Sequence, residues 1–179
     1  MRGVQHVALL RGIGPGNPKM RNVVLIEVLS RAGFEDVRSV ISSGNYLFRS
    51  EGHDRRTIEQ RMEAALAEHL GSHCVAIVRS RRQMEGIAAL DVFDGEDDGP
   101  TARCNVTFLQ RRPPAGVGPP ADGDGYRFVA AARQSVFCTV DSSRSQTPAV
   151  MAALEATYGK QITTRTWKTV HRIVRAFDA

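Results

Sequence analysis

Residues 4–20, VQHVALLRGIGPGNPKM, decide how the fold begins. Val4–Leu10 alternates and then becomes continuously apolar, which predicts a buried first strand. Asn17 followed by Pro18 is typical of a helix start, because an asparagine side chain caps free N–H groups and proline fits the first helical position. Between strand and helix, Arg11–Lys19 is rich in glycine and proline and predicts a loop.

The rest of the first half continues this order. Two short strands, Val37–Ser42 and Tyr46–Arg49, are expected to form a hairpin, because residues 43–45, SGN, supply turn chemistry. Asp54 is expected to cap a second helix that ends at Gly71, and Cys74–Val78 is predicted to be a further buried strand. The order strand-helix-strand-strand-helix-strand is that of the ferredoxin-like unit.

The second half repeats part of this pattern. The apolar pattern predicts a strand over Ala102–Leu109, a hairpin of Tyr126–Ala131 and Ser135–Val140, a helix starting at Thr147 and a short strand at Ile162. A long Pro/Gly loop replaces the first crossover helix, and one helix is added at each end. No repeat is visible residue by residue, so duplication is suggested by element order alone.

These elements predict an α+β protein made of two packed ferredoxin-like (α-β plait) subdomains with antiparallel sheets. The boundary is expected near Ser80, giving subdomains of residues 1–80 and 81–179 that pack together and exchange elements, or one compact unit. A chain of 179 residues with 42% hydrophobic residues is long enough to bury a core without a metal or a disulfide.

The net charge of +5 favours anionic partners, and a merely solvated basic surface is the alternative. The three cysteines have no CxxC spacing, so neither a disulfide framework nor a zinc site is expected. Each lies in an apolar, strand-like run and is expected to be a core residue. His69 and His73 have a metal-like spacing, but Gly71 lies between them and no third ligand is near. No cofactor is expected. The acidic stretch Asp94–Asp98 is expected to be a solvated loop.

The chain shows neither an export signal nor a run of about 20 apolar residues that could span a membrane. We therefore expect no membrane association and a cytoplasmic location.

Three segments together carry a family resemblance. Residues 7–20, VALLRGIGPGNPKM, residues 43–45, SGN, and residues 163–170, TTRTWKTV, resemble the corresponding segments of the bacterial domain of unknown function 1697. The resemblance covers nearly the whole chain and implies two α-β plait subdomains. It implies no activity. The chain departs from the family pattern at Gly14, Pro15 and Thr166, and the departures put a ligand held by asparagine side chains in doubt.

The loop between the first strand and the first helix is the best candidate for a binding site. Its glycines would let backbone N–H groups approach a ligand, and the following helix start would add partial positive charge. Its motif is neither a Walker nor a dinucleotide motif, and a simple connecting turn is the alternative. The residues proposed to bind an anion are Arg11, Gly12, Gly14, Gly16, Asn17 and Lys19.

Two further segments are weaker candidates. Ser43 and Asn45 either close a tight turn or contact a ligand, and Arg165 and Trp167 offer a cation and a stacking ring or serve as core residues. If Arg11, Asn45 and Arg165 converged in space, the three family-like segments would share one pocket.

Three classes of function remain open. The first is a module that binds an anionic ligand, such as a phosphorylated metabolite, a nucleotide or a nucleic acid. The second is an enzyme, which the absence of a recognisable nucleophile and base disfavours. The third is an interaction or assembly protein without a small ligand.

Overall fold

The computed structural model describes residues 3–14, 16–41, 44–51, 54–144 and 147–179. The chain divides into two compact units: Met1–Gly86 with Arg172–Ala179 form the first, and Ile87–His171 form the second. Both boundaries lie inside helices, namely α3 (Arg81–Ala88) and α5 (Trp167–Ala176). That residues 1–80 and 81–179 form two subdomains stays a prediction.

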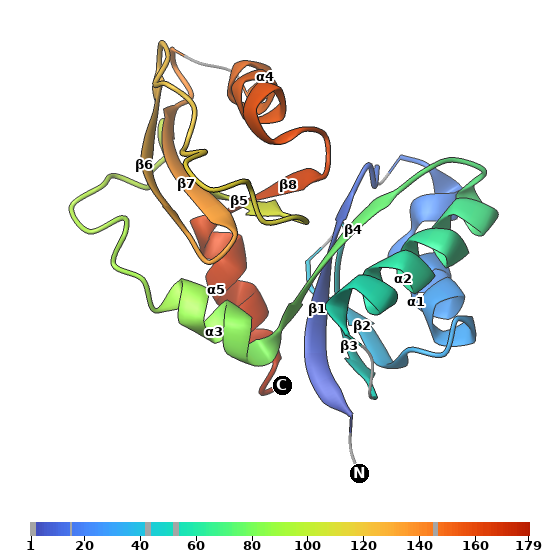
Figure 1. Cartoon of the computed structure of the whole chain (residues 1–179). Coiled ribbons are helices and arrows are strands. Elements are labelled where there is room, and N and C mark those ends of the chain that lie inside the picture. The colour runs from blue at the N-terminus through green and yellow to red at the C-terminus, as the bar shows by residue number, and fades with distance from the viewer. Residues whose placement is uncertain (1–2, 15, 42–43, 52–53, 145–146) are drawn as a thin grey trace. The chain divides into compact units, whose positions relative to one another are not determined.

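The first unit contains one four-stranded antiparallel sheet in the order β2-β3-β1-β4. Its elements up to α3 are β1 (Val4–Arg11), η1 (Pro18–Met20), α1 (Asn22–Arg31), β2 (Glu35–Ser39), β3 (Asn45–Ser50), α2 (Arg55–Leu70) and β4 (Val75–Ser80). Helices α1 and α2 lie on one face of this sheet (Figure 1).

The apolar run in β1 is continuous because both faces of the strand are buried. Ala8 and Leu10 pack into the core formed with α1 and α2. Val7 and Leu9 alternate with them, so they point to the opposite face, and both are also fully buried. The buried first strand predicted from the sequence is therefore present.

Capping defines the ends of α2 as the sequence predicted. The Asp54 carboxylate accepts hydrogen bonds from the backbone N–H groups of Arg56 and Thr57, at 2.8 and 3.2 Å. Gly71 ends the helix with a φ of +70°, a conformation that glycine adopts without the steric cost of a Cβ atom.

The first helix and the second strand begin at other residues than the sequence predicted. The proline at position 18 opens only the three-residue 3-10 turn η1, and α1 starts at Asn22 after Arg21 takes an extended conformation. Strand β2 starts at Glu35 and contains a bulge before Arg38, whereas the pattern placed it over Val37–Ser42. Position 42 lies outside the described residues.

The second unit contains another four-stranded antiparallel sheet, in the order β6-β7-β5-β8. Its elements are β5 (Ala102–Leu109), β6 (Tyr126–Ala132), β7 (Ser135–Asp141), α4 (Thr147–Tyr158) and β8 (Ile162–Thr166), with the end of α3 and the start of α5. Each strand takes the place that its counterpart has in the first unit. The loop over residues 110–125 stands where η1 and α1 stand in the first.

Among the described residues, the chain is thus an α+β protein with two four-stranded antiparallel sheets and five α-helices. The hairpin of β6 and β7 turns at Arg133 and Gln134, whose φ values of +52° and +55° suit a two-residue turn. The core of the second unit joins Leu154 of α4 to residues such as Val136 and Ile162 of its sheet.

No helix in the described ranges is long and apolar enough to cross a membrane. Cys74, Cys104 and Cys138 are all buried and unpaired. Burial raises the pKa of Cys74 and Cys138 to about 12 and that of Cys104 to about 11. A thiol is a poor nucleophile while it stays protonated, so these cysteines are core residues in this structure.

Truncation of one core leucine in each unit should show how much the two cores contribute to stability. Leu66 and Leu154 are both fully buried, and we expect Leu66→Ala and Leu154→Ala each to lower the free energy of unfolding by about 2–5 kcal/mol. Urea denaturation measures this change. The control is Val23→Ala at a position that is 72% exposed, which should change it by less than about 0.5 kcal/mol. Equal effects of all three substitutions would contradict the assignment of these cores.

The buried thiols should react with a disulfide reagent only after unfolding. At pH 8, well below the raised pKa values of about 11 and 12, the thiols of the folded protein should react slowly. In denaturant all three thiols should react at once, and each should release one thiolate from the reagent. The absorbance of the released thiolate follows the reaction. A thiol that reacts within seconds in the folded protein would show that one cysteine is accessible and activated.

Candidate functional site

The loop predicted to bind an anion leaves the end of β1 in the first unit. Arg11 is half-buried and pairs with Val75 of β4, and its carbonyl accepts a hydrogen bond from the thiol of Cys74 at 3.2 Å. Lys19 is exposed at the far end of the loop, where its carbonyl accepts a hydrogen bond from His69 at 3.1 Å. The two flanking cations are therefore both tied to the fold through their backbones.

The start of η1 has fewer free backbone N–H groups for an anion than the sequence suggested. Asn17 caps the turn with its own side chain, which accepts a hydrogen bond from the N–H of Lys19 at 3.0 Å. The next N–H groups, of Met20 and Arg21, donate to the carbonyls of Asn17 and Pro18. A three-residue turn also has little dipole, so the expected partial charge of a helix start is small here.

The glycines of the loop nevertheless leave its backbone open. A Cβ atom added to Gly12, Gly14 or Gly16 would meet no atom within 4 Å. Gly12 needs to be glycine because its φ is +85°, but Gly14 and Gly16 have neither a left-handed φ nor a crowded neighbourhood. The N–H of Gly14 donates to the sulfur of Met20 at 3.2 Å. Open space beside these residues is available to a ligand.

The second predicted segment borders this loop. Asn45 begins β3 opposite Leu9, two residues before Arg11. Its side chain is 2% exposed and donates a hydrogen bond to the carbonyl of Val40 at 3.2 Å, which closes the turn between β2 and β3. This contact fits the structural alternative for Asn45. Ser43 lies outside the described residues.

The third predicted segment belongs to the second unit. Arg165 donates to the Thr163 hydroxyl and the Thr164 carbonyl at 2.8 and 2.9 Å, and burial lowers its pKa to about 10. Trp167 packs edge-to-face against neighbouring aromatic rings, with centroid distances of 5.3 Å to Phe93, 6.2 Å to Phe137 and 4.7 Å to His171. Convergence of Arg165 with the loop and turn of the first unit stays a prediction.

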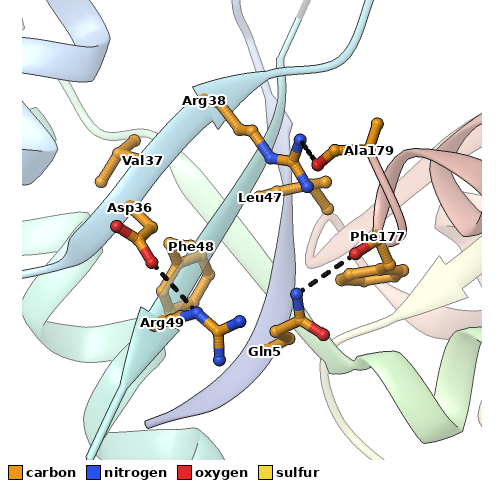
Figure 2. A pocket seen from close by; sticks show the side chains of 9 residues that line it. All are labelled: Gln5, Asp36, Val37, Arg38, Leu47, Phe48, Arg49, Phe177 and Ala179. Carbon is orange, nitrogen blue, oxygen red and sulfur yellow. Dashed lines mark hydrogen bonds and ion pairs between the residues drawn. The ribbon is translucent and has the colours of Figure 1, made fainter. Parts of the chain in front are cut away.

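A pocket that the sequence did not indicate lies in the first unit, with a volume of about 510 Å³ (Figure 2). Its polar side chains come from Gln5, Asp36, Arg38 and Arg49, and Phe177 is among its apolar ones. The volume is in the range of about 300–1,000 Å³ that is usual for small-molecule sites. Two arginine guanidinium groups border this cavity, so its chemistry suits an anion.

The bulge in β2 shapes one side of the pocket. Asp36 has a φ of +50° at this bulge, and its carboxylate pairs with Nε of Arg49 at 3.0 Å (Figure 2). Bulges often redirect a side chain near a functional site. The Asp36 side chain is 75% exposed, whereas that of Arg49 is only 24% exposed. The carboxylate therefore lies on the solvent side of the pair.

The side chains of Gln5, Arg38 and Arg49 differ in how many hydrogen bonds they already make within the chain. Arg38 donates to the carbonyls of Ala176 and Ala179, at 2.5 and 2.6 Å, so it anchors the segment after α5. Gln5 donates to the carbonyl of Phe177 at 3.3 Å.

Arg49 has a side-chain nitrogen that is not used within the described part of the chain. It donates through Nη1 to the Gly3 carbonyl at 2.9 Å, and its Nη2 has no partner among the described residues. One nitrogen of Arg49 is thus available to a ligand.

Sequence reasoning missed this pocket because its residues are far apart in the chain. Arg49 lies opposite Gln5 and Glu35 only through the register of β3 with β1 and β2. The one signal available was Arg49 directly after the apolar run Tyr46–Phe48. No group of three or more His, Cys, Asp or Glu side chains in the part of the chain that the structure describes could hold a metal ion.

Comparison with known proteins places the chain in a family but gives it no activity. No curated protein matches it significantly. The conserved bacterial protein SP0830 from Streptococcus pneumoniae has a similar fold, with a TM-score of 0.72 and 18% identity over 100% of both chains. The model of the family described as "Protein of unknown function (DUF1697)" matches residues 4–120. The chain therefore belongs to the DUF1697 family, in agreement with the segments at residues 7–20 and 43–45, whereas the third segment, residues 163–170, lies outside the matched range.

Proposed function

We propose that the first unit binds a small anionic ligand, such as a phosphate ester or a nucleotide, in the pocket of Figure 2. The observation that carries the proposal is the state of Arg49, whose Nη2 has no partner among the described residues and whose side chain is 24% exposed beside a cavity of about 510 Å³. A partly desolvated guanidinium attracts an anion more strongly than one in open water.

Exchange of the Asp36 carboxylate for an oxyanion of the ligand would let the ligand bind Arg49. Asp36 is mostly exposed, so its pair with Arg49 contributes little and its carboxylate can turn into water at small cost. A ligand oxyanion would then occupy the same side of the guanidinium and gain Nη2 as a second donor. Gln5 and the apolar side chains of Leu47 and Phe177 would contact the rest of the ligand.

The Arg11–Lys19 loop is the second place that could hold the anion. Arg11 and Lys19 flank it, and open space surrounds Gly12, Gly14 and Gly16. The N–H groups at the start of η1 are already used within the chain, which is why the pocket is preferred. Asn45 borders the loop. A nucleic acid would suit this loop better than it would suit a pocket of about 510 Å³.

Two finer statements belong to the same proposal. We propose that both units are α-β plaits of the ferredoxin-like kind, which the shared strand orders β2-β3-β1-β4 and β6-β7-β5-β8 support. We also propose a cytoplasmic location, which the three unpaired buried cysteines support because cytoplasmic thiols stay reduced.

Thermal-shift measurements on two arginine variants test the proposal and separate the two places. The wild-type protein is screened with inorganic phosphate, phosphate esters, nucleotides and short RNA and DNA. A ligand at a hundredfold excess over its Kd should stabilise the native state by about 2.7 kcal/mol. Arg49→Ala should abolish this gain and Arg11→Ala should retain it, because Arg49 lines the pocket and Arg11 does not.

The matched control is Arg31→Ala, which removes one exposed arginine that pairs with Glu27 on α1 of the same unit. It changes the net charge equally and should leave the ligand effect unchanged. The reverse result for the first two variants would move the site to the loop. If no anion stabilises the wild-type protein, or if both variants respond like wild type, anion binding by this unit is wrong. A steep loss of binding with salt would identify a nucleic acid.

A further inference from the structure

A second cavity lies in the second unit, and its wall is aromatic. It has a volume of about 320 Å³, and its lining includes Phe93, Trp167 and His171. The Trp167 ring packs edge-to-face against the other two, with centroid distances of 5.3 Å to Phe93 and 4.7 Å to His171. Trp167 was proposed from the sequence as a stacking ring for an anion, but the cavity beside it has a different chemistry.

The other side of this cavity carries carboxylates. Two of them are already paired: Glu96 with Arg127 at 2.6 Å, and Asp98 with the N–H of Cys104 at 3.2 Å and with Lys168 at 3.7 Å.

Asp91 and Asp94 also line the cavity, and both are exposed. Neither carboxylate has an ion-pair or hydrogen-bond partner among the described residues. The cavity therefore has an excess of negative charge, although the whole chain has a net charge of +5.

The arrangement does not suit a metal ion. The cavity is lined by carboxylates, a thiol and an imidazole, yet no three such groups in the described part of the chain come close enough together to hold a metal. Carboxylates spread around aromatic rings suit a larger cation with apolar surface. The face of an indole ring attracts such a cation through its quadrupole, and the carboxylates attract it through their charge.

We infer that the second unit binds a small organic cation, an alkylammonium or guanidinium compound, against Trp167 and between Asp91 and Asp94. A volume of about 320 Å³ is at the lower end for small-molecule sites, so the ligand is a small molecule rather than a polymer. This inference does not depend on the anion site of the first unit, because every residue that carries it belongs to the second.

Intrinsic fluorescence provides a direct test, because Trp167 is the sole tryptophan of the chain. Choline and agmatine are titrated into the millimolar range at constant ionic strength, with sodium chloride as the balancing salt. The emission of Trp167 should change and saturate with one or both cations. The neutral isostere of choline, 3,3-dimethylbutan-1-ol, should produce no such change because it lacks the charge.

Charge-neutralising variants identify the site. Asp91→Asn with Asp94→Asn should weaken binding by about fivefold, since exposed ion pairs each contribute modestly. The control is Asp97→Asn, which removes one carboxylate charge from the same loop outside the lining of the cavity and should leave binding unchanged. Calorimetric titration of Trp167→Phe gives a second measurement, in which the smaller ring should weaken binding without removing the carboxylates.

Three results would overturn the inference. The first is no saturable change with either cation. The second is equal binding of the neutral isostere, which would make the cavity merely apolar. The third is unchanged binding by the double aspartate variant, which would place the cation elsewhere. Because Asp91 and Asp94 are exposed and have no partners among the described residues, their variants should fold like wild type, and thermal unfolding checks this.

Discussion

Pairing of β1 along both of its edges is the constraint on which the rest of the first unit depends. The strand hydrogen-bonds to β3 on one side and to β4 on the other, so it occupies the interior of the sheet. An interior strand covered on both faces has to be apolar throughout, as Val7–Leu10 is. The two ends of β1 then determine where chemistry is possible: Arg11 leads into the glycine-rich loop, and Gln5 reaches the pocket beside Arg49.

The same constraint places the aromatic cavity of the second unit. Strand β5 is interior there, between β7 and β8, and Asn105 pairs with the last residue of β8, Thr166. Helix α5 starts directly afterwards, with the Thr166 hydroxyl accepting a hydrogen bond from the N–H of Thr169 at 3.2 Å. Trp167 therefore follows directly after the edge strand β8, where β8 pairs with the interior strand β5, and it lines the cavity together with Cys104 and the acidic loop.

Local charge and net charge differ in this protein. The excess of arginine gives the chain its charge of +5, yet the two cavities carry opposite signs because different side chains converge on them. Screening at physiological ionic strength limits the reach of exposed charges to about 8 Å, so a ligand responds to the groups that line its cavity. The net charge of the chain therefore has the same sign as the charged side chains around Arg49 and the opposite sign to those around Trp167.

Most of the secondary structure could be predicted from short-range patterns. The interior strands, the cap at Asp54, the helix end at Gly71 and the turn near Arg133 depend on residues close together in the chain, where propensity and capping act. The bulge in β2 and the short turn η1 could not be predicted, because each depends on how its segment meets the rest of the sheet.

The candidate sites divide along the same line. The sequence by itself determined the α+β class, the family, the loop from Arg11 to Lys19 and the burial of the three cysteines, since these follow from local composition and pattern. Only the tertiary structure decided that Arg49 borders a pocket with Gln5 and Phe177, and that Trp167 lines one cavity with Asp91 and Asp94. The reason is strand register: a one-residue shift of a strand would turn each of its side chains to the other face, and no short stretch of sequence specifies the partner across the sheet.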